Sequence, residues 1–121
     1  MTAQLIQDPV IAAHIAAINK LDLDAIMETF ADDALVNDAS REFWGSAHIR
    51  AFIAKEFVGD RVTVDPVEIV DNAGMWCVRC RYDGDYDKTG LPEPLVMTNY
   101  FRLRDDKIVS LIIIKNTQPQ Y

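Results

Sequence analysis

The stretch Leu95-Val96-Met97-Thr98-Asn99-Tyr100-Phe101-Arg102-Leu103-Arg104 alternates along its length. Its odd-numbered residues are, as a set, more apolar than its even-numbered residues. A period of two is typical of a β-strand that turns one face to a core and the other away from it. We therefore expect the odd-numbered side chains to face the core, with Asn99 as the polar exception among them.

The same period continues through the second half of the chain. It predicts strands over residues 61–70, 75–87 and 108–115, with turns at 71–74 and 104–107. Strands of this length and order are typical of a curved antiparallel sheet. On the strand over 75–87, parity turns one set of side chains inward and another outward. The inward set is Trp76, Val78, Cys80 and Tyr82, and the outward set includes Arg79 and Arg81.

The first half of the chain is helical by pattern. Asp8-Pro9 is a helix start, because Asp caps a helix and Pro fits its first turn. Further helices are predicted over 22–30 and from Gly45 to Phe57, with a short strand over 34–38. Helices followed by strands indicate an α+β fold. The 121 residues fit a single domain, 1–121, with three N-terminal helices covering one face of the sheet.

Composition excludes several classes of partner. The chain has 12 Lys and Arg against 19 Asp and Glu, a formal charge of -7, which opposes binding to nucleic acid or an anionic membrane surface. No apolar run approaches the length of a membrane-spanning helix, and no basic, secretory-type N-terminus is present. We therefore expect a cytoplasmic protein, and its two cysteines do not make a disulfide scaffold.

The last predicted strand, over 108–115, is apolar on both faces. One face meets the helices, so something must cover the other. A second copy of the chain is the simplest cover, and we expect a homodimer formed through the sheet.

Three polar residues interrupt apolar patterns. His14 lies within the apolar stripe of the first helix, Asn99 on the inner strand face, and Asp38 beside Val36. Their convergence at the open end of a helix-covered sheet would make a pocket. Each also has a structural interpretation: Asp38 as a turn cap, His14 as a hydrogen-bonded core histidine, and Asn99 as a bridge at a sheet bend.

Several segments resemble one superfamily. They are Phe30-Ala31-Asp32-Asp33-Ala34, Val36-Asn37-Asp38, Gly45, Ile49-Arg50-Ala51-Phe52, Tyr100-Phe101-Arg102-Leu103 and Lys107-Ile108-Val109-Ser110. Together they resemble the nuclear-transport-factor-2-like superfamily, in its SnoaL-like and ketosteroid-isomerase-like branch. The resemblance spans nearly the whole chain. It implies a cone of curved sheet closed by three helices, usually dimeric, with a ligand cavity inside.

The resemblance also implies roles for the three polar residues. Asp38 falls at the position of the general base of ketosteroid isomerase. That enzyme is a standard example of carboxyl groups whose pKa is set by their surroundings. His14 and Asn99 fall at the positions of the oxyanion-hole tyrosine and protonated aspartic acid, and both can donate hydrogen bonds to a developing enolate oxygen. The superfamily's epoxide hydrolases instead hold an inward arginine between carboxylates, whereas parity turns Arg79, Arg81 and Arg102 outward.

These observations predict an enzyme without a cofactor or a metal ion. Its substrate would be a small, apolar, carbonyl-containing molecule, which it isomerises, cyclises or dehydrates with Asp38 as the base and His14 and Asn99 polarising the substrate oxygen. The alternatives are a non-catalytic module that binds a small ligand or only dimerises, and a protein-transport adaptor. The residues expected to line the cavity, or only to fill it, are Phe30, Trp44, Phe52, Trp76, Tyr82, Met97 and Phe101.

Overall fold

The computed structural model describes residues 8–116, which form helices followed by a six-stranded sheet. The helical elements are α2 (Pro9–Asn19), α3 (Leu23–Glu28), α4 (Gly45–Ile53) and the π-helix η1 (Ala54–Val58). The strands are β1 (Phe30–Asp38), β2 (Arg41–Trp44), β3 (Thr63–Asn72), β4 (Met75–Asp83), β5 (Leu95–Arg104) and β6 (Lys107–Asn116). The predicted α+β class with three N-terminal helices is confirmed.

The sheet is mixed. Its strand order is β2-β1-β6-β5-β4-β3, and every neighbouring pair is antiparallel except β1 and β6, which are parallel. The prediction of a wholly antiparallel sheet is therefore corrected for this one pair. The pairing joins the start of the sheet to its end, so it brings Asp38 of β1 beside Ile113 of β6.

A side-chain cap marks the start of α2, and three tight hairpins share one backbone conformation. The Asp8 carboxylate accepts hydrogen bonds from the backbone N–H groups of Val10 and Ile11, which caps α2. Both central residues have positive φ in the β1–β2 turn (Ala39 and Ser40), in the β3–β4 turn and in the β5–β6 turn. Two consecutive positive φ values match the right-handed twist of the strands that such a turn joins.

Several predicted boundaries move. The strand expected over 34–38 begins at Phe30, and the helix expected to reach Phe30 ends at Glu28. The helix expected to reach Phe57 changes at Ala54 into η1, and the strand expected to reach Asp87 ends at Asp83. Strand β2 was not predicted.

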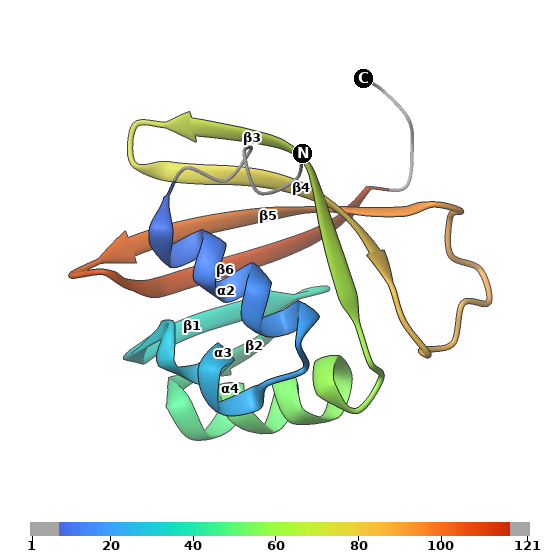
Figure 1. Ribbon diagram of the computed structural model, residues 1–121, viewed down its shortest axis with the longest axis horizontal. Coiled ribbons are helices and arrows are strands. Elements are labelled where there is room, and N and C mark those ends of the chain that lie inside the picture. The colour runs from blue at the N-terminus through green and yellow to red at the C-terminus, as the bar shows by residue number, and fades with distance from the viewer. Residues whose placement is uncertain (1–7, 117–121) are drawn as a thin grey trace.

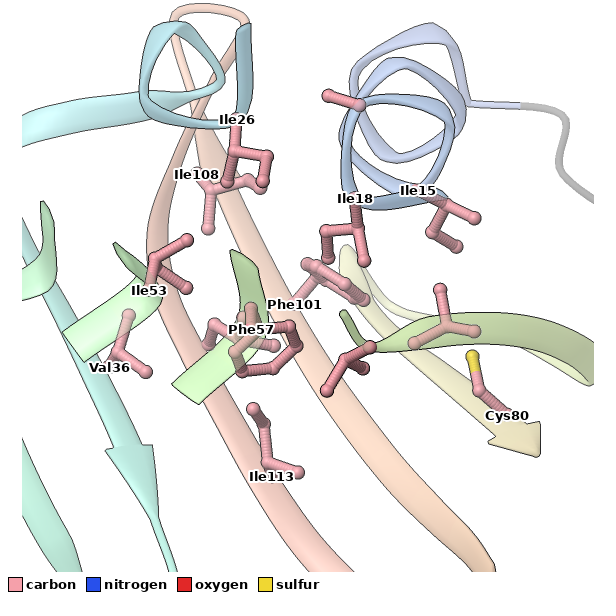
Figure 2. Close-up of a cluster of buried hydrophobic side chains, with 14 of the residues drawn as sticks. Ile15, Ile18, Ile26, Val36, Ile53, Phe57, Cys80, Phe101, Ile108 and Ile113 are labelled. Atoms are coloured by element: carbon pink, nitrogen blue, oxygen red, sulfur yellow. The ribbon is translucent and has the colours of Figure 1, made fainter. Parts of the chain in front are cut away.

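The helices pack on one another and on the inner face of the sheet. Figure 1 shows α2 crossing the strands, with α3 and α4 beside β1 and β2. Figure 2 shows side chains of α2 and α3 turned toward the strands and η1. The buried core includes Ile15, Ile18, Ile26, Phe57, Phe101, Ile108 and Ile113. Its burial is the main stabilising term of the fold.

The predicted strand faces are confirmed. Val78, Cys80 and Tyr82 of β4 are buried, and Trp76 is packed against the core. On β5, Leu95, Asn99 and Phe101 are buried, whereas Arg102 is exposed. The inner face of the sheet is therefore the surface on which a site could be built.

Candidate functional site

A cavity of about 600 Å³ opens where β1 and β6 end and β5 begins. Its walls also include η1, the turn after it, and the segment that follows β4. The volume exceeds the roughly 300 Å³ at which small-molecule sites begin. The apolar and aromatic lining is formed by Phe57, Val62, Tyr82, Tyr86, Leu91, Leu95, Met97 and Ile113. Ile112 and Ile114 also border the cavity where β6 ends, but alternation along the strand turns their side chains to the outer face of the sheet.

Asp38 is the last residue of β1 and borders this cavity. Its side chain is 20% exposed, and one carboxylate oxygen lies 2.8 Å from Nη2 of Arg41. Desolvation raises the pKa of the Asp38 carboxyl, the Arg41 hydrogen bond and charge oppose that shift, and the Glu56 charge adds to it. The net shift is upward, which makes Asp38 a stronger base than an ordinary aspartate.

Arg41 joins Asp38 to a second carboxylate at the cavity. Its Nη1 and Nη2 atoms donate to the two oxygens of Glu56 at 2.8 and 2.9 Å, and Nη2 also donates to Asp38. The bond to Arg41 lowers the pKa of Glu56 while burial raises that of Asp38. Paired carboxyls with opposite shifts are typical of sites that divide acid and base roles.

Arg41 and Glu56 were missed from the sequence. Asp38 and Arg41 pair across the β1–β2 turn. The two central residues of this turn, Ala39 and Ser40, are not among the Asn, Asp and Gly residues that usually mark a two-residue hairpin. Glu56 lies in η1, where a π-helical turn shifts residues away from the positions that α-helical spacing predicts. The spacing of Asp38 and Arg41 around two residues was the only available signal.

His14 is buried, as predicted, with 1% of its surface exposed. The Thr29 hydroxyl donates to the Ile26 carbonyl at 2.6 Å, so its oxygen accepts from His14 Nδ1 at 3.0 Å. Burial lowers the pKa of His14 to about 4, which keeps the ring neutral near pH 7. Nε2 is then an acceptor, so His14 in this arrangement does not donate from Nε2.

Asn99 is also buried, and both polar atoms of its amide are hydrogen-bonded. Its Oδ1 accepts from the Tyr82 hydroxyl at 2.6 Å, and its Nδ2 donates to the Val78 carbonyl at 3.2 Å and that of Met97 at 3.4 Å. The structural interpretation of Asn99, a bridge to the backbone, therefore applies to this arrangement.

The structure does not bring the three polar residues into one pocket. His14 and Asn99 line a separate void of about 10 Å³, which holds no more than about one water molecule. Asp38 borders the larger cavity instead, and Tyr82 lines both spaces. The predicted convergence is therefore corrected: Asp38 borders one space, His14 and Asn99 line the other, and Phe57, Tyr82 and Ile113 border both.

Of the seven residues predicted to line the cavity, only Tyr82 and Met97 do so. Trp44 is 58% exposed, because it pairs with Leu35 on the outer face while Val36 points inward. The other four belong to the core or pack against it. Phe52 stacks on Phe43, Phe30 and Phe101 contact the His14 ring edge-on, and Trp76 packs against the core.

Most lining residues that the sequence analysis missed come from irregular segments. Phe57 and Asp60 lie in and after η1, and Tyr86 and Leu91 follow β4. Strand parity says nothing about such positions. These residues lie together at the cavity because of the path that residues 84–94 follow between β4 and β5.

The outward arginines are confirmed on the sheet. Arg81 pairs with Asp65 at 2.9 Å, Arg79 pairs with Glu68 at 3.1 Å, and Arg102 is exposed. Within residues 8–116, no group of three or more His, Cys, Asp or Glu side chains is arranged to hold a metal ion. In the same part of the chain no helix has the length and apolarity needed to cross a membrane.

Comparison with known proteins identifies the family. The model of the SnoaL-like domain matches residues 11–111. No curated protein matches the chain at a significant level.

Solved structures share the fold. A candidate polyketide cyclase from Sinorhizobium meliloti is 24% identical, with a TM-score of 0.81, over 93% of this chain and 99% of its own. TerC, co-crystallised with polyporic acid, is 18% identical, with a TM-score of 0.73, over 89% of each chain. A ketosteroid-isomerase-like protein from Catenulispora acidiphila, in complex with trimethylamine, is 22% identical, with a TM-score of 0.72, over 89% of this chain and 85% of its own. Identities this low show the fold alone.

Proposed function

This chain belongs to the SnoaL-like domain family, and we propose that it binds a small, apolar, carbonyl-containing molecule and removes a proton from it with Asp38. The observation that carries the proposal is the position of Asp38. It is a carboxylate with a raised pKa on the wall of a cavity of about 600 Å³. The reaction class is isomerisation, cyclisation or dehydration, without a cofactor.

The cavity supports the binding step. Its lining is mainly apolar, which favours a molecule with little charge in its body. Solved relatives were crystallised with small molecules, polyporic acid in one and trimethylamine in another. The fold therefore accommodates small ligands of different chemistry.

The position of Asp38 supports the chemical step. A carboxylate shielded from water binds a proton more readily, and it can accept one from a carbon next to a carbonyl. The charge that develops on the carbonyl oxygen needs a hydrogen-bond donor. Hydrogen-bond donation by His14 and Asn99 to the substrate oxygen stays a prediction. It requires the Tyr82–Asn99 and His14–Thr29 hydrogen bonds to break when the substrate binds.

A second candidate is a non-catalytic ligand-binding module. It is favoured by the ion pair between Asp38 and Arg41, which already satisfies one oxygen of the carboxylate. In that case the Asp38–Arg41–Glu56 group has a structural role, joining the β1–β2 turn to η1.

Hydrogen exchange separates these candidates. In D2O, a base that removes the proton next to a carbonyl replaces it with deuterium, and 1H NMR detects the loss for a small apolar ketone such as 2-tetralone. We expect the protein to accelerate exchange and Asp38→Asn to reduce that acceleration by about 100-fold or more. The matched control is Asp106→Asn in the β5–β6 turn, which also removes one charge. Binding without exchange would favour the non-catalytic module, and unchanged exchange in Asp38→Asn would remove Asp38 from the mechanism.

The dimer proposal rests on the outer face of the sheet. Tyr100 and Ile112 are half-buried there, and Val70 and Ile114 are 47% and 50% exposed. Neither helix nor loop of the described residues packs on this face in Figure 1. Apolar side chains without cover favour a second sheet as their partner.

A further inference from the structure

The charged side chains at the cavity are mostly acidic. Asp38, Glu56, Asp60 and Asp87 line it, together with one lysine, Lys115 of β6. Arg41 binds the first two of these carboxylates, as described above. The negative charge that is left to interact with a ligand therefore comes mainly from the other two carboxylates, Asp60 and Asp87.

Asp60 and Asp87 form no ion pair within residues 8–116. The Asp87 carboxylate accepts from the Thr89 backbone N–H at 3.0 Å, and the nearby Lys88 pairs with Asp83 at 2.8 Å. Asp60 is half-buried, and its side chain makes no hydrogen bond or salt bridge in this part of the structure. A half-buried carboxylate without a cation attracts positive charge more strongly than an exposed one.

The backbone holds Asp60 in place. Its carbonyl accepts from the Asp85 N–H at 2.7 Å, which ties the turn after η1 to the segment after β4. Gly84 allows this approach, since a Cβ on it would lie 2.9 Å from the Asp60 carbonyl oxygen. The Asp60 carboxylate is therefore attached to a fixed part of the cavity wall.

We propose that the cavity selects apolar molecules that carry a positively charged amine over those that carry a carboxylate, and that Asp60 is the main determinant of this selectivity. The inference rests on the proposed function, because it assumes that the cavity binds a small apolar molecule. The amine interacts with Asp60 at the cavity wall while the apolar body contacts Leu95, Met97 and the other apolar lining residues. The half-buried Tyr86 also lines the cavity, but Lys88 Nζ lies 5.7 Å from its ring centroid, so we assign the selectivity to Asp60 and not to this ring.

The charge on Lys115 opposes this selection only in part. Lys115 is exposed, so water screens its charge more than that of the half-buried Asp60. We therefore expect an amine to bind about tenfold more tightly than a matched carboxylate at low ionic strength. Because the cavity is open to solvent, added salt should reduce this ratio.

Three naphthalenes of similar size test the proposal. 1-Naphthylmethylamine is cationic at neutral pH, 1-naphthylmethanol is neutral, and 1-naphthylacetate is anionic. Their affinities are measured by isothermal titration calorimetry for the wild-type protein at about 20 mM and about 500 mM salt. The same titrations are run on Asp60→Asn and on Asp106→Asn, which removes one charge in the turn between β5 and β6.

The expected result is an order of affinity of amine, alcohol, carboxylate. Asp60→Asn should lower the amine-to-carboxylate ratio from about tenfold to about threefold, whereas Asp106→Asn should leave it within about twofold of wild type. Equal binding of amine and carboxylate, or an equal effect of the two substitutions, would overturn the inference, while binding of the alcohol would still uphold the binding step of the proposed function. If none of the three compounds binds, the inference fails, and the 2-tetralone exchange decides the proposed function separately.

Discussion

Asp38 and Asn99 lie on the same inner face of the sheet, one on each side of Ile113. Asp38 pairs with Ile113 in the parallel β1–β6 ladder, and Asn99 pairs with it in the antiparallel β5–β6 ladder. Two strand spacings of about 4.8 Å separate their backbones by about 10 Å. Tyr82 donates to Asn99 from the next strand, and Asn99 lines the small void whereas Asp38 borders the larger cavity.

The Tyr82 hydroxyl is expected to contribute to stability. Tyr82→Phe leaves the buried Asn99 Oδ1 without its 2.6 Å donor, which should lower the free energy of unfolding by about 1–2 kcal/mol. Urea denaturation measures the change. Tyr100→Phe, on the outer face, is the control and should cost less than about 0.5 kcal/mol. An equal cost for both variants would show that the buried bond adds nothing.

Arg41 is expected to set the titration of both cavity carboxylates. Arg41→Gln removes the charge that lowers the pKa values of Asp38 and Glu56, so both pKa values should rise. 13C NMR titration of the carboxyl carbons measures them directly. Arg104→Gln is the control, because Arg104 pairs with Asp33 instead.

The Arg41→Gln variant must stay folded if its titration is to report on the loss of the Arg41 charge. Since Arg41 is about half exposed, its loss should cost less than about 1 kcal/mol of stability, so the variant should remain folded. Unchanged titration of Asp38 and Glu56 in a folded variant would contradict the role given to Arg41.

His14 is expected to make stability depend on pH. Its pKa is about 4 in the folded state, below the ordinary 6.5, so the folded protein binds fewer protons between these values. Its contribution is therefore complete above about pH 6.5 and lost as the pH falls toward 4, by about 3 kcal/mol.

His14→Leu isolates this contribution. Urea denaturation of wild type and variant from pH 7.5 to 4 should show that the wild type loses more stability than the variant does. His48→Gln, at an exposed position, should retain the wild-type dependence. Parallel curves for wild type and His14→Leu would contradict a buried, neutral His14.

The outer face of the sheet is expected to form a dimer. Ile114→Lys places a charge on the half-exposed apolar surface of β6, which should shift the protein from dimer to monomer. Sedimentation equilibrium measures the mass of each variant. A wild-type protein that is monomeric at high concentration would contradict the homodimer.

The strands and their faces could be predicted because alternation is a local property. The β5 stretch has the predicted bounds, Leu95–Arg104, and its inner residues Asn99 and Phe101 are buried. The parallel pairing of β1 with β6 could not be predicted in this way, since it joins segments far apart in sequence. Strand β2 was missed because it has four residues and follows a turn of Ala39 and Ser40.

The site was only partly predictable for a related reason. Asp38, His14 and Asn99 were each placed inward, and the structure bears this out for all three. Whether they share a pocket depends on the large side chains of Phe57, Tyr82 and Ile113, which border both spaces. Sequence patterns give the face on which a residue lies but not how far a neighbouring side chain extends.

The most direct test of Asp38 as the base is the pH dependence of 2-tetralone exchange in D2O. After subtraction of the exchange without protein, the wild-type rate should rise with pH through an inflection above 3.8, since burial raises the pKa of Asp38. Asp38→Asn should abolish that inflection, whereas Asp106→Asn should retain it. A rate without this inflection, or an inflection that survives in Asp38→Asn, would contradict the assignment of Asp38 as the base at the cavity.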